Sequence, residues 1–311
     1  MPDNELEALT AYYRRVVRRM MYSNGDLEDP LSDSVEMVLD MAKFQMVKAL
    51  EDAWRRVIAD HRHQITLEDV MFVFRQHKFH LKRLLQFAEA AEKIRHLQRA
   101  APRAPKLDED VDRESDEEQD AVPSTSLPDS NLDRMRCIVE RMDLKMSADE
   151  LMQRPDREYE RRQRRIANIV MNEMSAEEYP QFTEARTATF LDEKPKQGLK
   201  RKKTDADLMR WLGAPANCEP SVAFVLAFIG REVVATYVDA AYNIMLNEQP
   251  NLFLNDVRSG HAAIGDEPCP LQVRHYSEAL RRNLGWRLHK DFLFGCSEDP
   301  DDNPLTHQQQ G

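Results

Sequence analysis

Glycine is scarce in this chain. Only nine of its 311 residues are glycine, less than half of the usual share of about 7%. Folds that depend on glycine for tight turns or phosphate-binding loops, such as β-sandwiches, propellers and dinucleotide-binding sheets, are therefore poor candidates. Charged residues make up 32% of the chain and methionine occurs 15 times. Together with the shortage of glycine, this composition favours long helices.

Clustered cysteines and long apolar runs are also lacking. Cys137, Cys218, Cys269 and Cys296 lie far apart, so neither a disulfide framework nor a zinc module is expected, and a reducing compartment is the default. The most apolar run, residues 222–229, is far shorter than the roughly 20 residues that cross a bilayer. The first five residues have neither the basic nor the apolar part of a secretory signal. We therefore expect a soluble intracellular protein without a membrane contact.

An excess of basic residues is missing as well. The chain has 55 acidic and 44 basic residues and a formal net charge of −11. A protein whose main task is to hold nucleic acid is usually basic, because phosphate neutralisation supplies most of the affinity. Direct DNA binding is therefore expected to be weak at best.

Sequence motifs of catalysis and cofactor binding are absent. The sequence has no glycine-rich phosphate loop, no Gly-x-Ser-x-Gly and no His-Glu-x-x-His. Two histidine pairs, His61 with His63 and His77 with His80, supply too few ligands for zinc, which takes three or four. We interpret these histidines as solvated loop and helix residues, and we expect neither an enzyme nor a cofactor or metal.

Apolar residues recur at helical spacing through the first hundred residues. The pattern predicts a first helix over 5–22 and a second helix of about 28 residues after Pro30, with one apolar stripe over more than six turns. Thr66 is a good N-cap for a short third helix, with Asp69 at the capping-box position. A fourth helix is expected over 77–98.

Composition divides the rest of the chain. Residues 1–98 form the first helical unit with its extra C-terminal helix. Residues 99–131 are expected to be a disordered linker, because nine acidic residues lie between Asp108 and Asp120. Residues 132–203 are a charged helical region followed by a basic linker. Residues 204–296 form a second unit, and residues 297–311 are expected to be a disordered tail.

The second unit repeats the order of the first. A short helix ends at Gly213, a long helix runs from Pro220 to about Glu248, and a last short helix follows Pro270. A long helix between two short ones is the architecture of the histone fold, which buries its apolar stripe only against a second copy packed head to tail. The chain carries two copies, at about 5–77 and 205–283. We therefore expect an all-α protein whose two histone folds form an intramolecular pair, with Gly230 at a close helix crossing.

One short motif makes this resemblance specific. Arg62-x-x-Ile65-Thr66-x-x-Asp69-Val70 resembles the end of a histone-fold second loop and the start of its third helix. The resemblance implies that Arg62 and Asp69 clamp the loop to the helix and that Ile65 joins a short β-bridge. We interpret this pair as structural.

Longer stretches point to one family. The runs 25–31 and 67–78 are similar to the first histone fold of the suppressor-of-Ty three family of SAGA coactivator subunits. Residues 178–190, 207–212 and 270–282 resemble the rest of that family, whose two folds resemble TFIID subunits thirteen and eleven. The resemblance implies a nuclear, non-enzymatic subunit beside other SAGA histone-fold subunits. It would help to deliver the TATA-binding protein to promoters for transcription by RNA polymerase II.

A polar stripe on the second long helix is the candidate partner site. Glu232, Thr236, Asp239 and Asn243 lie at offsets of 0, 4, 7 and 11 residues on an otherwise apolar helix. Simple solvation explains such a stripe, and so does an acidic surface for a partner. The resemblance implies a partner with a basic exposed surface, the TATA-binding protein, so Glu232 and Asp239 are the first candidates for that contact.

Three basic clusters remain. Lys200, Arg201, Lys202 and Lys203 form a candidate nuclear import signal, with a charged linker as the alternative. The arginines at 14, 15, 18 and 19 could hold DNA phosphates, but a solvated face, or one paired with acids of a neighbouring subunit, fits the net charge better. The arginines between 157 and 165 lie at spacings that suggest a helix paired with its own glutamates.

Three other functions remain open from the sequence. A TFIID-like subunit made by fusion of two partner folds is the nearest alternative to a SAGA subunit. A doublet histone that packages DNA comes next and would need a basic outer surface. An enzyme is the weakest alternative, because no catalytic motif supports it.

Overall fold

The computed structural model describes residues 2–100, 130–191, 205–248, 262–264 and 267–296, and this part of the chain is all-α. Two two-residue strands, β1 (Ala263–Ile264) and β2 (Glu267–Pro268), form a small antiparallel hairpin. Residues 101–129 of the predicted acidic linker, the basic stretch before the second unit and the C-terminal tail lie outside the described residues, while residues 99–100 and Asn131, at the two ends of that linker, are helical. Among the helices that are described, none is long and apolar enough to cross a membrane.

The first histone fold begins with α1 (Pro2–Ser23) and continues with the long helix α2 (Ser32–Ala59). Its last elements are α3 (Leu67–Met71), the short 3-10 helix η1 (Phe72–Phe74) and the extra helix α4 (Lys78–Ala100). α2 has the 28 residues that its apolar stripe predicts, and the buried stripe runs from Val35 to Val57. Gly25 has a φ of 104°, a conformation that favours glycine, and it turns the chain after α1.

The second histone fold has the same order of helices. It consists of α9 (Asp205–Trp211), the long helix α10 (Val222–Glu248) and α11 (Val273–Arg282), followed by α12 (Leu284–His289). α10 is buried along nearly its whole length. A helix that is apolar on almost every side must be covered from several directions. α2 and α11 pack against it, and α1, α3, α4 and α9 complete the cover.

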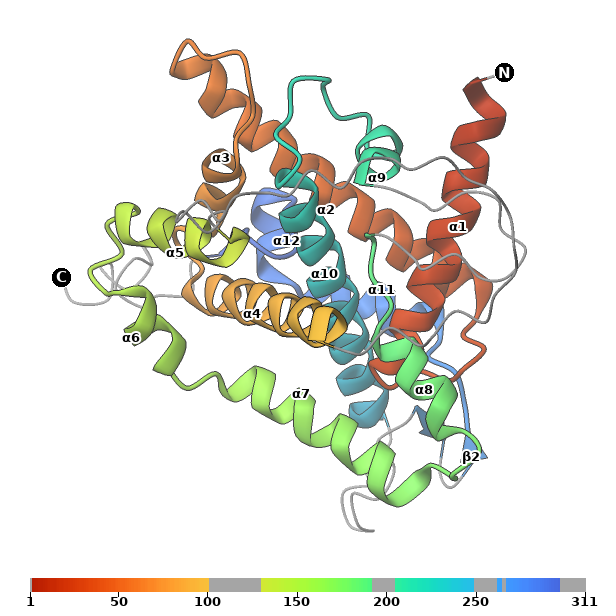
Figure 1. Cartoon of the computed structure of the whole chain (residues 1–311). Helices are drawn as coiled ribbons and strands as arrows, with labels where there is room; N and C mark the ends of the chain where they lie inside the picture. The colour runs from red at the N-terminus through yellow and green to blue at the C-terminus, as the bar shows by residue number, and fades with distance from the viewer. Residues whose placement is uncertain (1, 101–129, 192–204, 249–261, 265–266, 297–311) are drawn as a thin grey trace, which may run out of the picture.

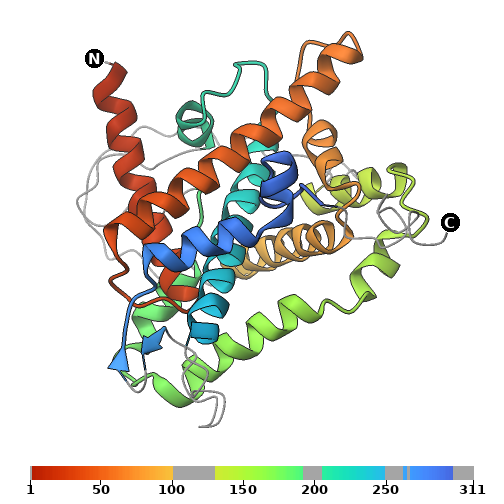
Figure 2. The same cartoon turned by 180° about the vertical axis from the view of Figure 1, so that it is seen from behind.

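The two folds pair head to tail within one chain. α2 and α10 cross at the centre of the molecule (Figure 1), and the view from behind shows α11 and α12 lying over the same crossing (Figure 2). Gly230 lies at the crossing, where a Cβ atom would be 2.8 Å from Cε2 of Phe190 and 3.0 Å from Cε of Met46. The small residue therefore permits the close approach that the sequence suggested.

Backbone hydrogen bonds join the loops of the two folds at both ends. Ile65 forms an isolated parallel bridge with Cys218, in which the Ile65 N–H donates to the carbonyl of Asn217 at 3.0 Å. In return, the N–H of Glu219 donates to the carbonyl of Ile65 at 2.9 Å. At the opposite end, the N–H of Ala262 donates to the carbonyl of Gly25 at 2.9 Å. The second loop of each fold therefore meets the first loop of the other.

Asp26 strengthens one of these junctions from a buried position. Its carboxylate accepts hydrogen bonds from the N–H of Leu27 at 2.9 Å, from the N–H of Leu271 at 3.0 Å and from the hydroxyl of Tyr276 at 3.1 Å. Leu271 and Tyr276 belong to the second fold. Asp26 thus ties the turn after α1 to the start of α11.

The charged region between the folds wraps around the pair. It forms α5 (Asn131–Arg141), α6 (Ala148–Gln153), α7 (Arg157–Asn168), a single π-helical turn η2 (Ile169–Glu173) and α8 (Tyr179–Arg186). α5 and α6 pack on α4, and α8 packs on α1, while α7 runs along the outer edge of the molecule (Figure 1). A small separate core formed by Tyr22, Ile166, Ile169, Phe182 and Ala185 fixes the end of α7 to α1 and α8.

Candidate partner-binding surface

The acidic stripe of α10 is covered by another helix of the same chain. Glu232 and Asp239 are seven residues apart, so both point to the same side of α10, as the sequence indicated. Their exposed fractions are only 6% and 5%, however, because arginines of α7 and α4 reach across to them. The expectation of an open acidic face is wrong for the chain as it folds, since the helix that covers this face lies some 70 residues earlier in the sequence.

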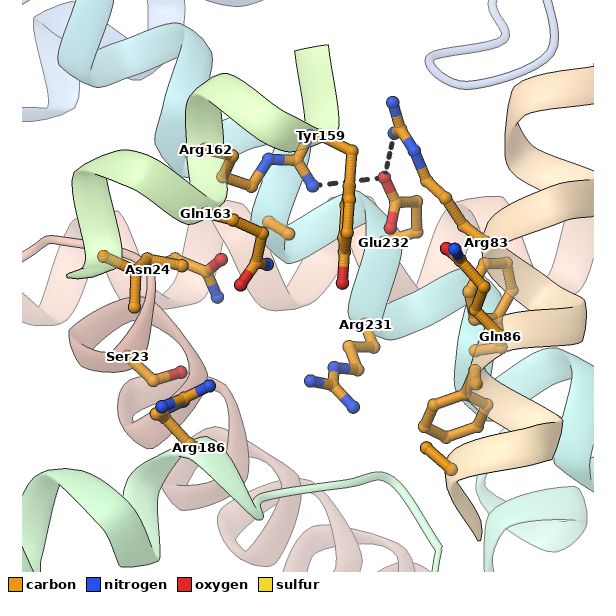
Figure 3. Close-up of a pocket in the computed structure, with 15 residues that line it drawn as sticks. Ser23, Asn24, Arg83, Gln86, Tyr159, Arg162, Gln163, Arg186, Arg231 and Glu232 are labelled. Atoms are coloured by element: carbon orange, nitrogen blue, oxygen red, sulfur yellow. Dashed lines mark hydrogen bonds and ion pairs between the residues drawn. The ribbon is translucent and has the colours of Figure 1, made fainter. Parts of the chain in front are cut away.

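Glu232 is held by two arginines from different helices. Nη1 of Arg83 on α4 donates to Oε1 of Glu232 at 2.5 Å, and Nη1 of Arg162 on α7 donates to the same oxygen at 3.2 Å (Figure 3). Burial alone would raise the pKa of Glu232, but the charges of Arg162 and Arg83 outweigh it and bring the pKa to about 2. The carboxylate is therefore ionised at neutral pH.

Arg83 also binds the start of α7. Its Nε donates to Oδ2 of Asp156 at 2.7 Å and its Nη2 donates to Oδ1 at 2.9 Å, a bidentate pair. Asp156 is the N-cap of α7, because Oδ1 accepts from the N–H of Tyr159 at 3.0 Å. Burial raises the pKa of Asp156, but its hydrogen bonds to Arg83 and Tyr159 prevail and lower it. One buried guanidinium thus joins α4, α7 and α10.

Asp239, two turns further along α10, is also paired with arginines of α7. Nη2 of Arg161 donates to Oδ2 of Asp239 at 2.9 Å, and Nη2 of Arg165 lies 3.0 Å from Oδ1. The Arg165 guanidinium also donates to the carbonyl of Asn24 at 2.9 Å and stacks on the ring of Tyr242 at 4.2 Å. Long arginine side chains therefore span the space between α7 and α10.

The α7 arginines are only partly paired within their own helix. Arg162 lies 3.6 Å from Glu158 and Arg164 lies 3.9 Å from Glu160, the spacing that the sequence suggested. Arg161, Arg162 and Arg165 make their shorter contacts with α10. Arg161 and Arg165 are one turn apart and both reach Asp239, whereas Arg162 reaches Glu232.

Arg62 and Asp69 form the ion pair that the loop motif suggested. Arg62 donates through both terminal nitrogens to the Asp69 carboxylate, with Nη1 to Oδ2 at 2.9 Å. Asp69 also accepts from the N–H of Thr66 at 2.9 Å and from its hydroxyl at 2.7 Å. Burial raises the pKa of Asp69, but these bonds outweigh it and lower the pKa. The pair holds the loop beside Ile65 against α3, next to the bridge to Cys218.

Arginines on α1 are paired within the chain rather than left for a partner. Arg14 pairs with Glu36, Arg18 Nη1 lies 2.8 Å from Asp29 Oδ1, and Arg19 Nη2 lies 3.2 Å from Glu184 Oε1, whereas Arg15 is exposed. The sequence alone also allowed pairing with acids of a neighbouring subunit. In the structure, the acids that pair with these arginines belong to the same molecule. The row is therefore largely neutralised before any partner arrives.

The histidine pairs differ from one another. His61 and His63 are exposed, as expected. His77 and His80 are buried, with ring centroids 5.1 Å and 5.7 Å from that of Phe294, so the expectation that they are solvated is wrong. The apolar segment after α12 covers them. Within the described ranges, no group of three or more His, Cys, Asp or Glu side chains could hold a metal ion.

The four cysteines are all described and are free. The import candidates Lys200, Arg201, Lys202 and Lys203 lie outside the described residues.

Arg83 and Asp156 are site residues that sequence reasoning missed. Arg83 lies among Leu81, Leu84 and Leu85, which are all fully buried. A single arginine at such a position of an apolar helix signals a buried ion pair, because a charge is rarely buried without a partner.

Comparison with known proteins fits this architecture. The family model described as "Transcription initiation factor IID, 18kD subunit" matches residues 11–101, which is the first histone fold with α4. SAGA complex subunit Spt3 of Schizosaccharomyces pombe is 24% identical to this chain over 291 residues, covering 88% of this chain and 90% of the relative. That match is long enough to include both histone folds and the region between them. The chain is therefore similar to a SAGA subunit along nearly its whole length, and its first histone fold is similar to a TFIID subunit family.

Proposed function

We propose that this protein is a subunit of a SAGA-type transcription coactivator in the nucleus, and that it acts by presenting surfaces rather than by catalysis. The observation that carries the proposal is the pairing of two histone folds within one chain, together with a relative named as a SAGA subunit that matches nearly end to end. In such a chain, each histone fold pairs with the other and needs no separate histone-fold partner. Its remaining outer surfaces are therefore free to serve assembly with other proteins.

Affinity purification of the tagged chain under near-physiological salt tests this proposal. Mass spectrometry should find other histone-fold subunits of a SAGA-type complex at near-equal stoichiometry. Recovery of TFIID subunits in their place would favour the alternative of a fused TFIID-like subunit. The match of the first fold to the 18-kDa TFIID subunit gives that alternative its support.

The partner that we propose for the acidic stripe of α10 is the TATA-binding protein, with Glu232 and Asp239 as the contact residues. In the chain as folded, the arginines of α7 occupy both carboxylates in the way that a basic partner would. For a basic surface of the TATA-binding protein to contact these carboxylates, α7 must therefore move away from α10. On this proposal, α7 and the TATA-binding protein compete for the same acidic stripe.

Two sets of charge-neutralising variants test that competition, because they should change affinity in opposite directions. The double variant E232Q/D239N should weaken binding of the TATA-binding protein, since its contact charges are lost. The double variant R161Q/R165Q should strengthen binding, because it frees Asp239 while leaving the carboxylate in place. R164Q changes a largely exposed arginine of the same helix and is the matched control. Loss of affinity in both double variants would instead mean that the pairs only keep α7 in place.

DNA packaging by a doublet histone is the remaining alternative. A net charge of −11 and the internal pairing of Arg14, Arg18 and Arg19 speak against it. Tight duplex binding that falls steeply with salt, without affinity for the TATA-binding protein, would favour DNA packaging over the coactivator role.

A further inference from the structure

A cavity of about 190 Å³ lies beside the Glu232 ion pairs. Its walls come from the end of α1 and from α4, α7, α8 and α10, so it is bounded by both histone folds and by the region between them (Figure 3). The volume exceeds that of a few water molecules at roughly 30 Å³ each. It is smaller than the pockets of about 300–1,000 Å³ that hold drug-sized ligands. The cavity is therefore of a size that fits a small ligand.

The charge of the cavity wall is strongly positive. Four guanidinium groups line the cavity, those of Arg83, Arg162, Arg186 and Arg231, against the single carboxylate of Glu232. Arg83 and Arg162 already neutralise Glu232 and bind Asp156 and Glu158 in addition. The guanidinium groups that line the cavity without forming an ion pair in the described part of the chain are therefore those of Arg186 and Arg231.

Arg186 and Arg231 converge on the cavity from different helices. Figure 3 shows the Arg231 guanidinium in the middle of the opening and the Arg186 guanidinium at its side. Across residues 2–100, 130–191, 205–248, 262–264 and 267–296, no carboxylate lies within ion-pair distance of either one. Both residues are exposed, so a ligand can reach them.

Arg231 is an exposed residue without an ion pair in the described part of the chain. Its guanidinium carbon lies over the ring of Phe87, 5.4 Å from the ring centroid. Desolvation lowers the pKa of Arg231, the charge of Glu232 acts against it, and the like charge of Arg186 lowers the pKa further. Two like charges that share a partly desolvated space gain from an anion between them.

Neutral donors complete the cavity wall. The side-chain amides of Gln86 and Gln163 and the hydroxyl of Tyr159 also line it, and none of the three has a hydrogen-bond partner in the described part of the chain. Amide N–H groups, a hydroxyl and two forked guanidinium groups are the donors that bind tetrahedral oxyanions, often with bidentate geometry.

We propose that this cavity is a binding site for a small phosphate-bearing anion, with Arg231 and Arg186 as its principal ligands and Gln86, Gln163 and Tyr159 as further donors. A bound phosphate group would contact α4 of the first fold, α7 and α8 of the connecting region and α10 of the second fold. It would therefore stabilise the paired arrangement as well as fill the cavity.

Isothermal titration calorimetry of the full-length chain with inorganic phosphate, pyrophosphate and glucose 6-phosphate tests the site at constant ionic strength, with chloride as reference. We expect saturable 1:1 binding and a rise in the unfolding temperature with phosphate concentration. The best of the three ligands tells whether the site takes free phosphate, a diphosphate or a phosphomonoester. Failure of all three to bind above chloride at millimolar concentration would overturn the proposal.

Two variants and a matched control locate the binding. R231Q and R186Q should each weaken phosphate binding by roughly ten- to a hundredfold, the effect of removing one charge-assisted hydrogen-bond donor. R164Q, on the outer side of α7, should bind as the wild type does. Far-ultraviolet circular dichroism without ligand checks that each variant is folded, and R186Q serves if R231Q is not. Equal binding by R186Q, R231Q and R164Q would place the anion elsewhere and overturn the assignment.

Discussion

Arg83 on α4 and Glu232 on α10 are 149 residues apart in sequence, and their side chains form a buried ion pair with Nη1 and Oε1 2.5 Å apart. Arg83 is 4% exposed and also binds Asp156 through two hydrogen bonds. Removing one member of such a network leaves its partners charged and buried. The pair is thus a junction of the two folds with the helix that covers them.

Replacing Arg83 should therefore destabilise the protein strongly. We expect R83M to lower the free energy of unfolding by about 3–5 kcal/mol, because the buried Asp156 loses its bidentate partner and Glu232 keeps only Arg162. Urea unfolding followed by circular dichroism measures the change. R164M removes an arginine that is largely exposed and should change stability by no more than about 0.5 kcal/mol. Equal effects of R83M and R164M would contradict a stabilising role for the buried network.

Asp26 should make stability depend on pH in a direction unusual for an aspartate. Burial raises its pKa from 3.8 to about 6, although its hydrogen bonds from Leu271, Leu27 and Tyr276 lower it in part. The folded chain therefore holds this proton more tightly than the unfolded chain does. The resulting stabilisation is complete below a pH of 3.8 and is lost as the pH rises through about 6.

The variant D26N isolates that effect. Between about pH 4 and about pH 7, the unfolding free energy of the wild type should fall relative to that of D26N by about 2–3 kcal/mol. Chemical unfolding at several pH values measures the difference, with D29N, which changes an exposed aspartate, as the control. A wild-type curve parallel to that of D26N would show that Asp26 does not titrate in this range.

Replacement of Gly230 by alanine should lower the stability of the protein. Alanine favours the helix by about 1 kcal/mol over glycine, but its Cβ would meet Phe190 at 2.8 Å and Met46 at 3.0 Å. Overpacking typically costs about 1–3 kcal/mol, so we expect G230A to be destabilised by about 1 kcal/mol. In a double-mutant cycle with M46A, the cost of G230A should shrink. An unchanged cost would mean that Met46 yields freely and that the contact does not limit packing.

Deletion of residues 205–296 should leave an aggregation-prone first fold. The buried stripe of α2 from Val35 to Val57 loses its cover from α10 and α11, and large exposed apolar faces associate. Size-exclusion chromatography with light scattering should show aggregates, and co-expression of residues 205–296 as a separate chain should restore a soluble pair. A stable, soluble monomer of the truncated chain would contradict the paired-fold interpretation.

Periodicity predicts the two folds well because the long helices are governed by burial. The apolar stripe of α2 gives its length, and the glycines with positive φ, Gly25 and Gly213, mark the turns after α1 and α9. Pairing follows from the same stripes, since neither long helix can be covered within its own fold. The wrapping of α5 to α8 around the pair could not be predicted, because it depends on surfaces that form only after the folds have paired.

The candidate site shows where reasoning from single helices fails. The spacing of Glu232 and Asp239 correctly gives one shared face, but it contains no information on what covers that face. Arg161, Arg162 and Arg165 hold the missing information, since their spacing matches two carboxylates seven residues apart. Matching charged faces between helices would have suggested the pairing, whereas the anion cavity needs the positions of several helices at once.

The α2–α10 crossing joins two folds of the same chain, so their association is unimolecular. Its equilibrium does not depend on protein concentration, because each fold is tethered to the other. Dilution cannot separate the pair. A separate histone-fold protein that binds one of the two folds must displace the other fold, which is tethered in the same chain. The ratio of the two folds in any assembly is also fixed at one to one by a single translation product.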